Sequence, residues 1–578
     1  MPGFESIQNM KKGFRHRSFF KTSPKEKLLL VIVLSIIAAI YFLTLSVNHN
    51  EAEDSLHYLS SISYGPLSEQ FNPDHLLYNF INYIFFHLWR LLGYEGNAEF
   101  LAKFINIIAA LSVLWLLYII ASKLKFPVFL KYFCIISVAF SYGFWWYSVE
   151  CETYIIPIIF ILLCFHRLIL IRENFFNLAN HLFLGVFNAL AILFHKQHTL
   201  LVVIIFLGYI LIFYENQKKI TWKKFISMTI IYTAVCGFIV LFSYLFVAVF
   251  IQGFFKFNDI TNWAMHLSAI SEDIGWHIYD FPKGVIGFCR NFIGGHYIFY
   301  FSIFSQLLKR TIPSSFTLKW EIFLIKDFSI LKIIFLYVLT LTEFFLVLYI
   351  IFQIIKHRSL RLMRSSESDL SHLSSFMIII LAGYFLVYSL FNVFFTRPQI
   401  LEVWISLGPI VFFILGLLTI PLIHKTRIRI SLGIMLLCLF LINLFGSVLP
   451  QTDREHDYYY KLNSWLIENC KPGDLVVSGL DYFSDGYVRF YSGARIFSYI
   501  ESGPTVEEKF REIVVLHKPK EIYFTSIVYP PFKEYKGRHL DISSAEKFIS
   551  KLSKYLTLVH SDSYQKIFLY KKDISDQL

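Results

Sequence analysis

The feature that most constrains this sequence is an apolar run of about 20 residues, from Leu28 to Val47, without one charged side chain. A helix needs about 20 residues to cross the hydrocarbon core of a bilayer. Further apolar segments of similar character follow near 101–121, 129–147, 153–171, 181–194, 198–214, 226–251, 329–355, 373–395, 401–422 and 429–449. The sequence therefore predicts a polytopic α-helical membrane protein with about eleven transmembrane helices.

The composition of the whole chain agrees with a membrane protein. Of its 578 residues, 56% are hydrophobic and 16% are charged, against about 25% charged residues in a typical soluble domain. The basic residues behind the net charge of +12 stand in short clusters between apolar segments, unlike the basic and aromatic face that binds nucleic acid. The seven cysteines are scattered singly, without the spacing of a zinc site or a disulfide framework. We expect membrane lipid as a partner, and no nucleic acid.

The positions of the basic residues predict the orientation of the chain. A basic cluster precedes the first span: Lys11, Lys12, Arg15, Arg17, Lys21, Lys25 and Lys27. Such a cluster normally stays in the cytoplasm, so residues 1–27 are expected to form a cytoplasmic N-terminus ahead of an uncleaved anchor. The later basic clusters also fall inside if residues 252–328 form a large outer loop. The apolar stretch from Phe288 to Leu308 is then an interfacial or re-entrant helix.

The character of the chain changes after Pro450. Charge rises, and short strand-like runs at 474–478 and 521–525 alternate with helical patterns. We therefore expect a transmembrane module over 28–450, with a first outer loop at 48–100, and a small soluble α/β domain over 451–578. An odd number of spans places this domain outside, in the periplasm or a lumen, with a bacterial inner membrane as the favoured location.

Polar residues gather in the first outer loop. If the segment after Glu53 is helical, Asp54, His57 and Tyr58 share one face at spacings of three and four. A carboxylate beside an imidazole suits general-base chemistry on a hydroxyl group. An ordinary acidic helix start explains the same residues equally well. The loop continues through a turn that contains His75 into an aromatic helix.

Three further polar clusters are expected at outer ends of spans. Glu150 and Glu152 stand beside Tyr154 near the bilayer surface, where a structural segment has little need for two carboxylates. Lys196 and His198 lie between two apolar runs, either beside a cavity or in a short hydrated hairpin. Arg397 closes another span, where a guanidinium can hold a phosphate or extend to lipid headgroups.

The four clusters, in this order and on one side, resemble the GT-C superfamily of polyprenyl-phosphate-sugar-dependent glycosyltransferases, particularly its protein O-mannosyltransferase-like branch. Glu53 and Asp54 look like the acidic pair of the first outer loop in that family, and the stretch from Asn72 to Tyr78 looks like a degenerate form of the element that follows it. The stretch from Phe144 to Tyr154 is similar to the aromatic and Glu-x-Tyr element of the family.

This resemblance implies an inverting glycosyl transfer on the outer face of the membrane. Asp54 would be the base that takes a proton from an acceptor hydroxyl, assisted by Glu53 and Glu152. The residues expected to bind the donor and its lipid phosphate are His57, His75, Tyr154, Lys196, His198 and Arg397, with Arg290 as a weaker candidate. No Asp, Glu and His set in the sequence has a spacing that compels a metal site, and the resemblance to the mannosyltransferase-like branch implies none, so we expect no required metal, although Glu53, Asp54 and His57 could bind one. No other cofactor is expected, and the lipid-linked sugar phosphate is the donor substrate.

Two other functions remain open from the sequence. A transporter or flippase of a lipid-linked sugar would want ionisable residues near mid-bilayer and some repeat symmetry. A non-catalytic membrane scaffold would tolerate replacement of Asp54 and Glu152. The acceptor is left open among protein, lipid and glycan.

Overall fold

The protein was analysed as a computed structural model that describes residues 23–52, 54–265, 280–311, 316–361, 369–396, 398–478, 482–499, 505–525, 542–563 and 565–570. Within these ranges, eight helices are long and apolar enough to cross a membrane, or nine if one bent pair counts as a span. The chain is therefore a multi-pass membrane protein.

Every expected apolar segment falls on a helix. The long helices are α2 (Pro24–Leu43), α5 (Glu99–Lys123), α8 (Ile156–Glu173), α9 (Leu178–Phe194), α10 (Leu201–Glu215), α11 (Trp222–Phe246), α17 (Ile330–Arg361), α18 (Asp369–Phe395), α19 (Leu407–Thr419) and α20 (Thr426–Asn443). Two of them stand apart from the eight spans, since α9 has only 17 residues and α8 carries Arg167, Arg172 and Glu173. The expected count of about eleven includes these two helices and the bent pair.

The bent pair consists of α6 (Val128–Phe140) and α7 (Tyr142–Ser148), which meet at an angle of 64°. The sequence predicts one continuous span here. A helix that restarts leaves its first N–H groups without partners. The backbone N–H groups of Tyr142 and Gly143 donate instead to the carbonyls of Phe292 and Asn291, at 3.1 and 3.0 Å. The bend turns the end of α7, and the loop that follows it, toward one end of the bundle.

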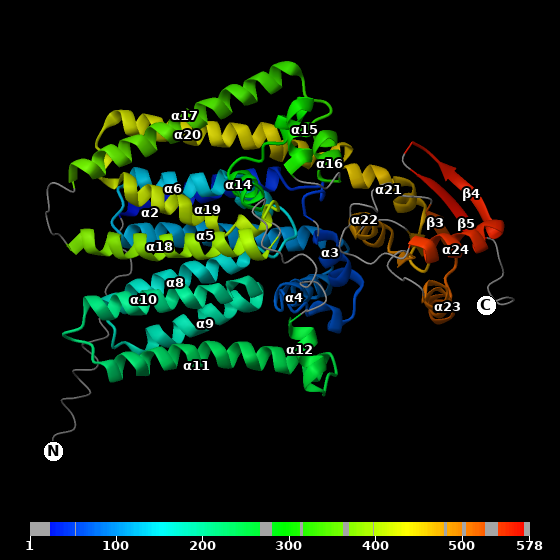
Figure 1. Cartoon of the computed structure of the whole chain (residues 1–578), viewed down its shortest axis with the longest axis horizontal. Coiled ribbons are helices and arrows are strands. Elements are labelled where there is room, and N and C mark those ends of the chain that lie inside the picture. Colours follow the sequence, from blue (N-terminus) through cyan, green and yellow to red (C-terminus); the bar gives the residue numbers. More distant parts are fainter. Residues whose placement is uncertain are drawn as a thin grey trace.

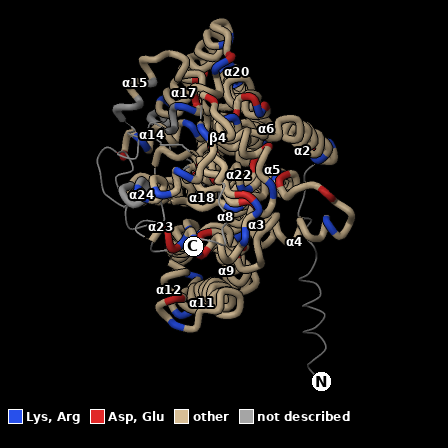
Figure 2. The backbone as a smooth tube through the Cα atoms, turned by 90° about the vertical axis from the view of Figure 1, so that its right-hand side faces the viewer, with Lys and Arg blue, Asp and Glu red and all other residues tan. Residues whose placement is uncertain are grey.

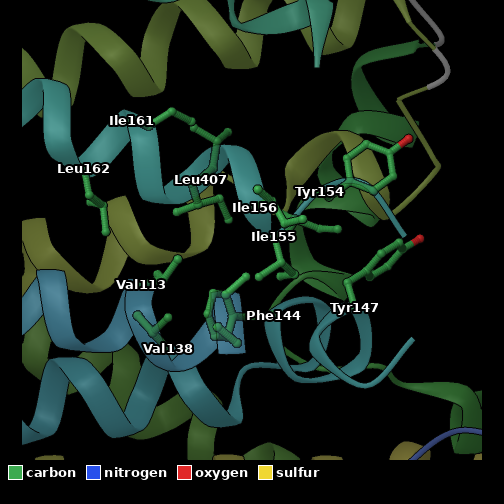
Figure 3. Close-up of a cluster of buried hydrophobic side chains, with 14 of the residues drawn as sticks. Val113, Val138, Phe144, Tyr147, Tyr154, Ile155, Ile156, Ile161, Leu162 and Leu407 are labelled. Carbon is green, nitrogen blue, oxygen red and sulfur yellow. The ribbon is translucent and has the colours of Figure 1, made fainter. Parts of the chain in front are cut away.

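The long helices pack side by side into one bundle (Figure 1). Helix α5 is more enclosed than α2, α10 or α11, and Val113 of α5, Val138 of α6, Leu162 of α8 and Leu407 of α19 face one another in the core of the bundle (Figure 3). Helices α2, α11 and α17 lie at the periphery and are mostly exposed. Their exposed surface is apolar, as a lipid-facing surface must be.

Short helices cover one end of the bundle, which we call the domain end because the C-terminal domain also lies there (Figure 1). They are α3 (Ser55–Tyr64), α4 (Tyr78–Leu91), α12 (Phe257–Met265), α14 (Asp280–Arg290), α15 (Ser302–Thr311) and α16 (Phe316–Leu324). The stretch from Phe288 to Leu308 is not one helix. It comprises the end of α14, a turn of 3-10 helix over His296–Tyr300 that follows the left-handed Gly295, and the first part of α15.

The C-terminal domain contains a five-stranded sheet with the order β2-β1-β3-β5-β4. Its elements are α21 (Tyr458–Asn469), β1 (Leu475–Ser478), α22 (Tyr482–Ser492), β2 (Arg495–Ser498), α23 (Val506–His517), β3 (Ile522–Thr525), α24 (Ile542–Leu552), β4 (Leu556–Ser561) and β5 (Lys566–Tyr570). The two predicted strands are β1 and β3, which pair in parallel. Helix α22 packs on α3 and α21 packs on α16, so the domain rests on the domain end.

Candidate active site

Three carboxylates lie close together at the domain end. Asp54 is the N-cap residue of α3, Glu152 lies in the loop between α7 and α8, and Glu402 begins the short 3-10 turn ahead of α19. We call this set the acidic cluster. Glu152 is fully buried, and neither of its carboxylate oxygens receives a well-formed hydrogen bond from the described residues. A buried, unpaired carboxyl group is costly for a fold, which makes Glu152 a candidate functional residue.

The surroundings of Glu152 control its protonation. Burial, together with the charges of Asp54, Glu402 and Glu150, raises the pKa of Glu152 well above its usual value. The protonated form of this carboxyl group is therefore favoured more than in an exposed glutamate, and in that form it can donate a hydrogen bond. Because the charges of Asp54 and Glu402 disfavour ionisation of Glu152, the cluster can combine acceptor groups with a donor group at one place.

We predict that Glu152→Gln flattens the pH dependence of stability. A carboxyl group with a raised pKa stabilises the fold at low pH, and this contribution is lost as the pH rises through the raised value. Glutamine matches the protonated form at every pH, so the thermal midpoint of the variant should exceed that of wild type increasingly as the pH rises above about 4.3, the ordinary pKa of a glutamate. Glu468→Gln, at an exposed position in α21, is the control. If the thermal midpoints of wild type and Glu152→Gln changed with pH in parallel, the pKa of Glu152 would not be raised.

Tyrosine and imidazole rings line the acidic cluster. Tyr147 and Tyr154 meet edge to face at 5.5 Å between ring centroids, and their hydroxyl groups point the same way, out of the apolar core (Figure 3). The ring of Tyr154 lies 5.0 Å from that of His195, which lies 4.7 Å from that of His75. Burial and the neighbouring His75 lower the pKa of His195. His195 is therefore neutral, with Nδ1 accepting from the Gln197 N–H at 3.3 Å and the proton on Nε2.

The structure separates the residues predicted for the first loop. The Tyr58 hydroxyl donates to Asp54 at 3.0 Å, as the spacing of four predicts. His57 packs against Gly486 of α22, where a Cβ atom would lie 3.1 Å from its Nε2 atom. His57 therefore contacts the C-terminal domain. Glu53 lies outside the described residues.

The predicted phosphate ligands point in different directions. The Lys196 ammonium lies 3.3 Å from an Asp74 carboxylate oxygen and donates to the Ala264 carbonyl at 3.0 Å. His198 Nδ1 meets the Tyr388 hydroxyl at 3.0 Å, inside the bundle. These two side chains do not share one anion pocket, and Arg397 lies outside the described residues.

A second set of buried charges, missed by the sequence analysis except for Arg290, lies beside the acidic cluster. Arg290 contacts Glu51 at 2.6 Å and Glu321 at 2.9 Å. His296 bonds to Glu321 through Nδ1 and approaches the Tyr142 hydroxyl through Nε2 at 2.9 Å. Burial raises the pKa of Glu321, but Arg290 and His296 outweigh it and the net shift is downward. We call this set the Arg290 network.

A third set, missed by the sequence analysis except for Glu150, surrounds His49. Its Nδ1 atom lies 2.9 Å from Glu150 and its Nε2 atom 3.5 Å from Glu99, which pairs with Lys103 at 2.6 Å. Burial lowers the pKa of His49, but the Glu150 carboxylate outweighs it and raises the pKa to about 9. We call this set the His49 network. The basic side chains of His49 and Lys103 thus balance the acidic side chains of Glu99 and Glu150.

Along the backbone, positions of basic and of acidic residues are interspersed around α3, α5 and α22 when the domain end faces the viewer (Figure 2). Among the residues that the structure describes, no three His, Cys, Asp or Glu side chains converge as a metal ion requires. The metal independence of the reaction nevertheless stays a prediction, because it concerns activity.

Comparison with known proteins reveals a likeness of fold without a likeness of sequence. No family model and no curated protein sequence matches the chain. Among solved structures, ArnT from Cupriavidus metallidurans bound to undecaprenyl phosphate superposes with a TM-score of 0.55 over 96% of this chain and 100% of ArnT, at 10% identity. The chain has an ArnT-like fold. The predicted GT-C-like fold is thereby confirmed.

A weaker match is the oligosaccharyltransferase of Archaeoglobus fulgidus in complex with Zn and sulfate. Its TM-score is 0.46, at 14% identity, over 86% of this chain and 67% of that protein. The ArnT-like fold therefore rests on the first match. The O-mannosyltransferase-like branch stays a prediction.

Proposed function

We propose that this protein is an inverting glycosyltransferase that moves a sugar from a polyprenyl-phosphate donor to an acceptor hydroxyl on the non-cytoplasmic face of the membrane. The observation that carries the proposal is the acidic cluster, with the buried and unpaired Glu152 beside Asp54, at the end of an ArnT-like bundle. The ArnT structure that superposes on this chain was solved with undecaprenyl phosphate. A lipid-linked donor of the same chemical class is the natural substrate for such a fold.

In the proposed reaction, the oxygen of the acceptor hydroxyl attacks the anomeric carbon of the donor sugar. Asp54 accepts the proton that this hydroxyl loses. The bond from that carbon to the phosphate oxygen breaks, the configuration inverts, and polyprenyl phosphate leaves. The Tyr58 hydroxyl, 3.0 Å from Asp54, orients the carboxylate. Protonated Glu152 is a hydrogen-bond donor for a sugar or acceptor oxygen. General-base help of this kind supplies about 10²–10⁴ in rate.

The departing phosphate needs positive charge or hydrogen-bond donors. Lys196 is 29% exposed and its partner Asp74 is 37% exposed, so a phosphate can displace Asp74 from the ammonium group. The neutral His195 and the Tyr154 hydroxyl offer further donors on the side facing Glu152. Arg290 is a poorer candidate, because Glu51 and Glu321 already hold its guanidinium.

The distribution of basic residues supports an outward-facing site. The N-terminal end of the described chain lies at the end of the bundle opposite the C-terminal domain (Figure 1). The ion pairs Lys123 with Glu173 and Arg172 with Glu215 join the turns of the long helices away from the acidic cluster. Basic loops normally stay in the cytoplasm. We therefore propose that the N-terminus lies inside and that the acidic cluster and the C-terminal domain lie outside. A bacterial inner membrane is the location proposed from the sequence.

Sugar transfer by the purified protein tests the proposal. Wild-type protein in lipid nanodiscs would be incubated with a panel of polyprenyl-phosphate sugars and with peptide, lipid and glycan acceptors. We expect at least one donor to be consumed, with free polyprenyl phosphate detected by mass spectrometry. The same protein in proteoliposomes tests transport: donors that cross the membrane without being cleaved would instead support a transporter, and neither cleavage nor transport would favour a scaffold.

A further inference from the structure

The C-terminal domain holds the backbone that leads into the acidic cluster. Residues 47–50 follow the first span and precede Asp54. The N–H groups of Val47 and Asn48 donate to the Gln451 carbonyl at 3.1 and 3.2 Å. The Asn48 side chain donates to the His456 carbonyl at 2.9 Å, and the Tyr459 N–H donates to the Asn50 side chain at 3.3 Å. Residues 47–50, which lead to Asp54, are therefore hydrogen-bonded along their length to residues 451–459.

Asp457 and Tyr487 form the centre of this contact. Asp457 is fully buried, caps α21 by accepting from the Tyr460 N–H at 2.9 Å, and accepts from the Tyr487 hydroxyl at 2.7 Å. The His49 N–H donates to the same hydroxyl at 3.1 Å and lies 3.4 Å from the Asp457 carboxylate. The Tyr487 hydroxyl thus bridges a carboxylate of the domain and the backbone of the loop.

His49 carries this contact on to the acidic cluster. Its Nδ1 atom bonds to Glu150 at 2.9 Å. Glu150 also accepts from Ser55, the residue next to Asp54, at 2.8 Å. The Asn106 side chain donates to the carbonyls of both Glu150 and Glu152, at 2.7 and 2.8 Å. A shift of His49 would therefore move Glu150, and through it disturb both Asp54 and Glu152.

We propose that Asp457 and Tyr487 are positioning residues for glycosyl transfer: they fix the His49 backbone and, through Glu150, set the positions of Asp54 and Glu152. This inference rests on the proposed function. It assigns the C-terminal domain a part in catalysis, although neither residue touches the reacting atoms. A misplacement of catalytic groups by about 1 Å can cost about a hundredfold in rate.

Tyr487→Phe is the decisive variant, because it removes the bridging hydroxyl and leaves the cap of α21 intact. We expect hydrogen exchange in residues 46–58 to become roughly tenfold faster, as the loss of a buried hydrogen bond implies. We expect kcat to fall by about ten- to a hundredfold while KM for the donor stays within about twofold. Asp457→Ala should act in the same way, and Asp457→Asn, which keeps an acceptor oxygen, should recover most of the loss.

Tyr499→Phe is the matched control, since it removes a buried hydroxyl from the sheet core of the same domain away from the loop. It should change neither exchange over 46–58 nor kcat. Unchanged exchange and kcat in folded Tyr487→Phe and Asp457→Ala would overturn the proposal, as would an equal effect of Tyr499→Phe. Hydrogen exchange needs no turnover, so failure of the proposed function appears separately, as wild-type protein that consumes no donor.

Discussion

Replacing Asp54 by Asn is expected to lower kcat for sugar transfer by about a thousandfold, within the range of about 10²–10⁴ that a general base contributes. Asparagine keeps the shape of the side chain and still accepts from the Tyr58 hydroxyl, which lies 3.0 Å from Asp54. It cannot take a proton from the acceptor. KM for the donor should change little, because the missing interaction exists only in the transition state. Initial rates in nanodiscs, with saturating donor and acceptor, measure the effect.

Asp259→Asn is the control for this variant. Asp259 is an exposed aspartate of α12, also at the domain end, and lies outside the acidic cluster. Its replacement should leave kcat within about twofold, because exposed substitutions away from a site rarely affect more than solubility. A folded Asp54→Asn variant with wild-type kcat would show that another group is the base, and Glu402 would then be the first carboxylate to replace.

Local spacing predicts the parts of this structure that depend on neighbours along the chain. The spacing of Asp54 and Tyr58 predicts their contact, and the pair Glu152 and Tyr154 does lie together in the site. The strands at 475–478 and 522–525 follow from short β-branched and aromatic runs bounded by turns. The long apolar helices follow from composition alone.

Long-range pairing is the part that local spacing cannot predict. Glu51 and Arg290 are 239 residues apart and meet only because the loop that holds Glu51 and the end of α14 cover the same end of the bundle. The break at Ser141 is equally hidden, since residues 129–147 form one apolar run. That break depends on carbonyls of residues 291 and 292, which supply acceptors for the freed N–H groups. Sequence analysis therefore named Asp54 and Glu152 of the acidic cluster, but it missed Glu402 and most of the charged groups in the two neighbouring networks.

Replacing Arg290 by Met is expected to cost about 3–5 kcal/mol in the free energy of unfolding, because it leaves two buried carboxylates without their common partner. Glu51 and Glu321 are 6% and 1% exposed at their side chains, and both contact the guanidinium. His296 can offset part of the remaining charge on Glu321. Denaturant unfolding in detergent, followed by tryptophan fluorescence, measures the loss.

An exposed ion pair provides the control for the buried Arg290 network. Arg489→Met breaks the pair with Glu69, in which both side chains are about 40% exposed, and it should cost at most about 1 kcal/mol. Adding Glu321→Gln to Arg290→Met should recover stability, because the double variant buries one carboxylate fewer. Equal losses for the two arginine variants, or no recovery in the double variant, would mean that Arg290 stays solvated and available. Arg290 would then return as a ligand for the departing phosphate.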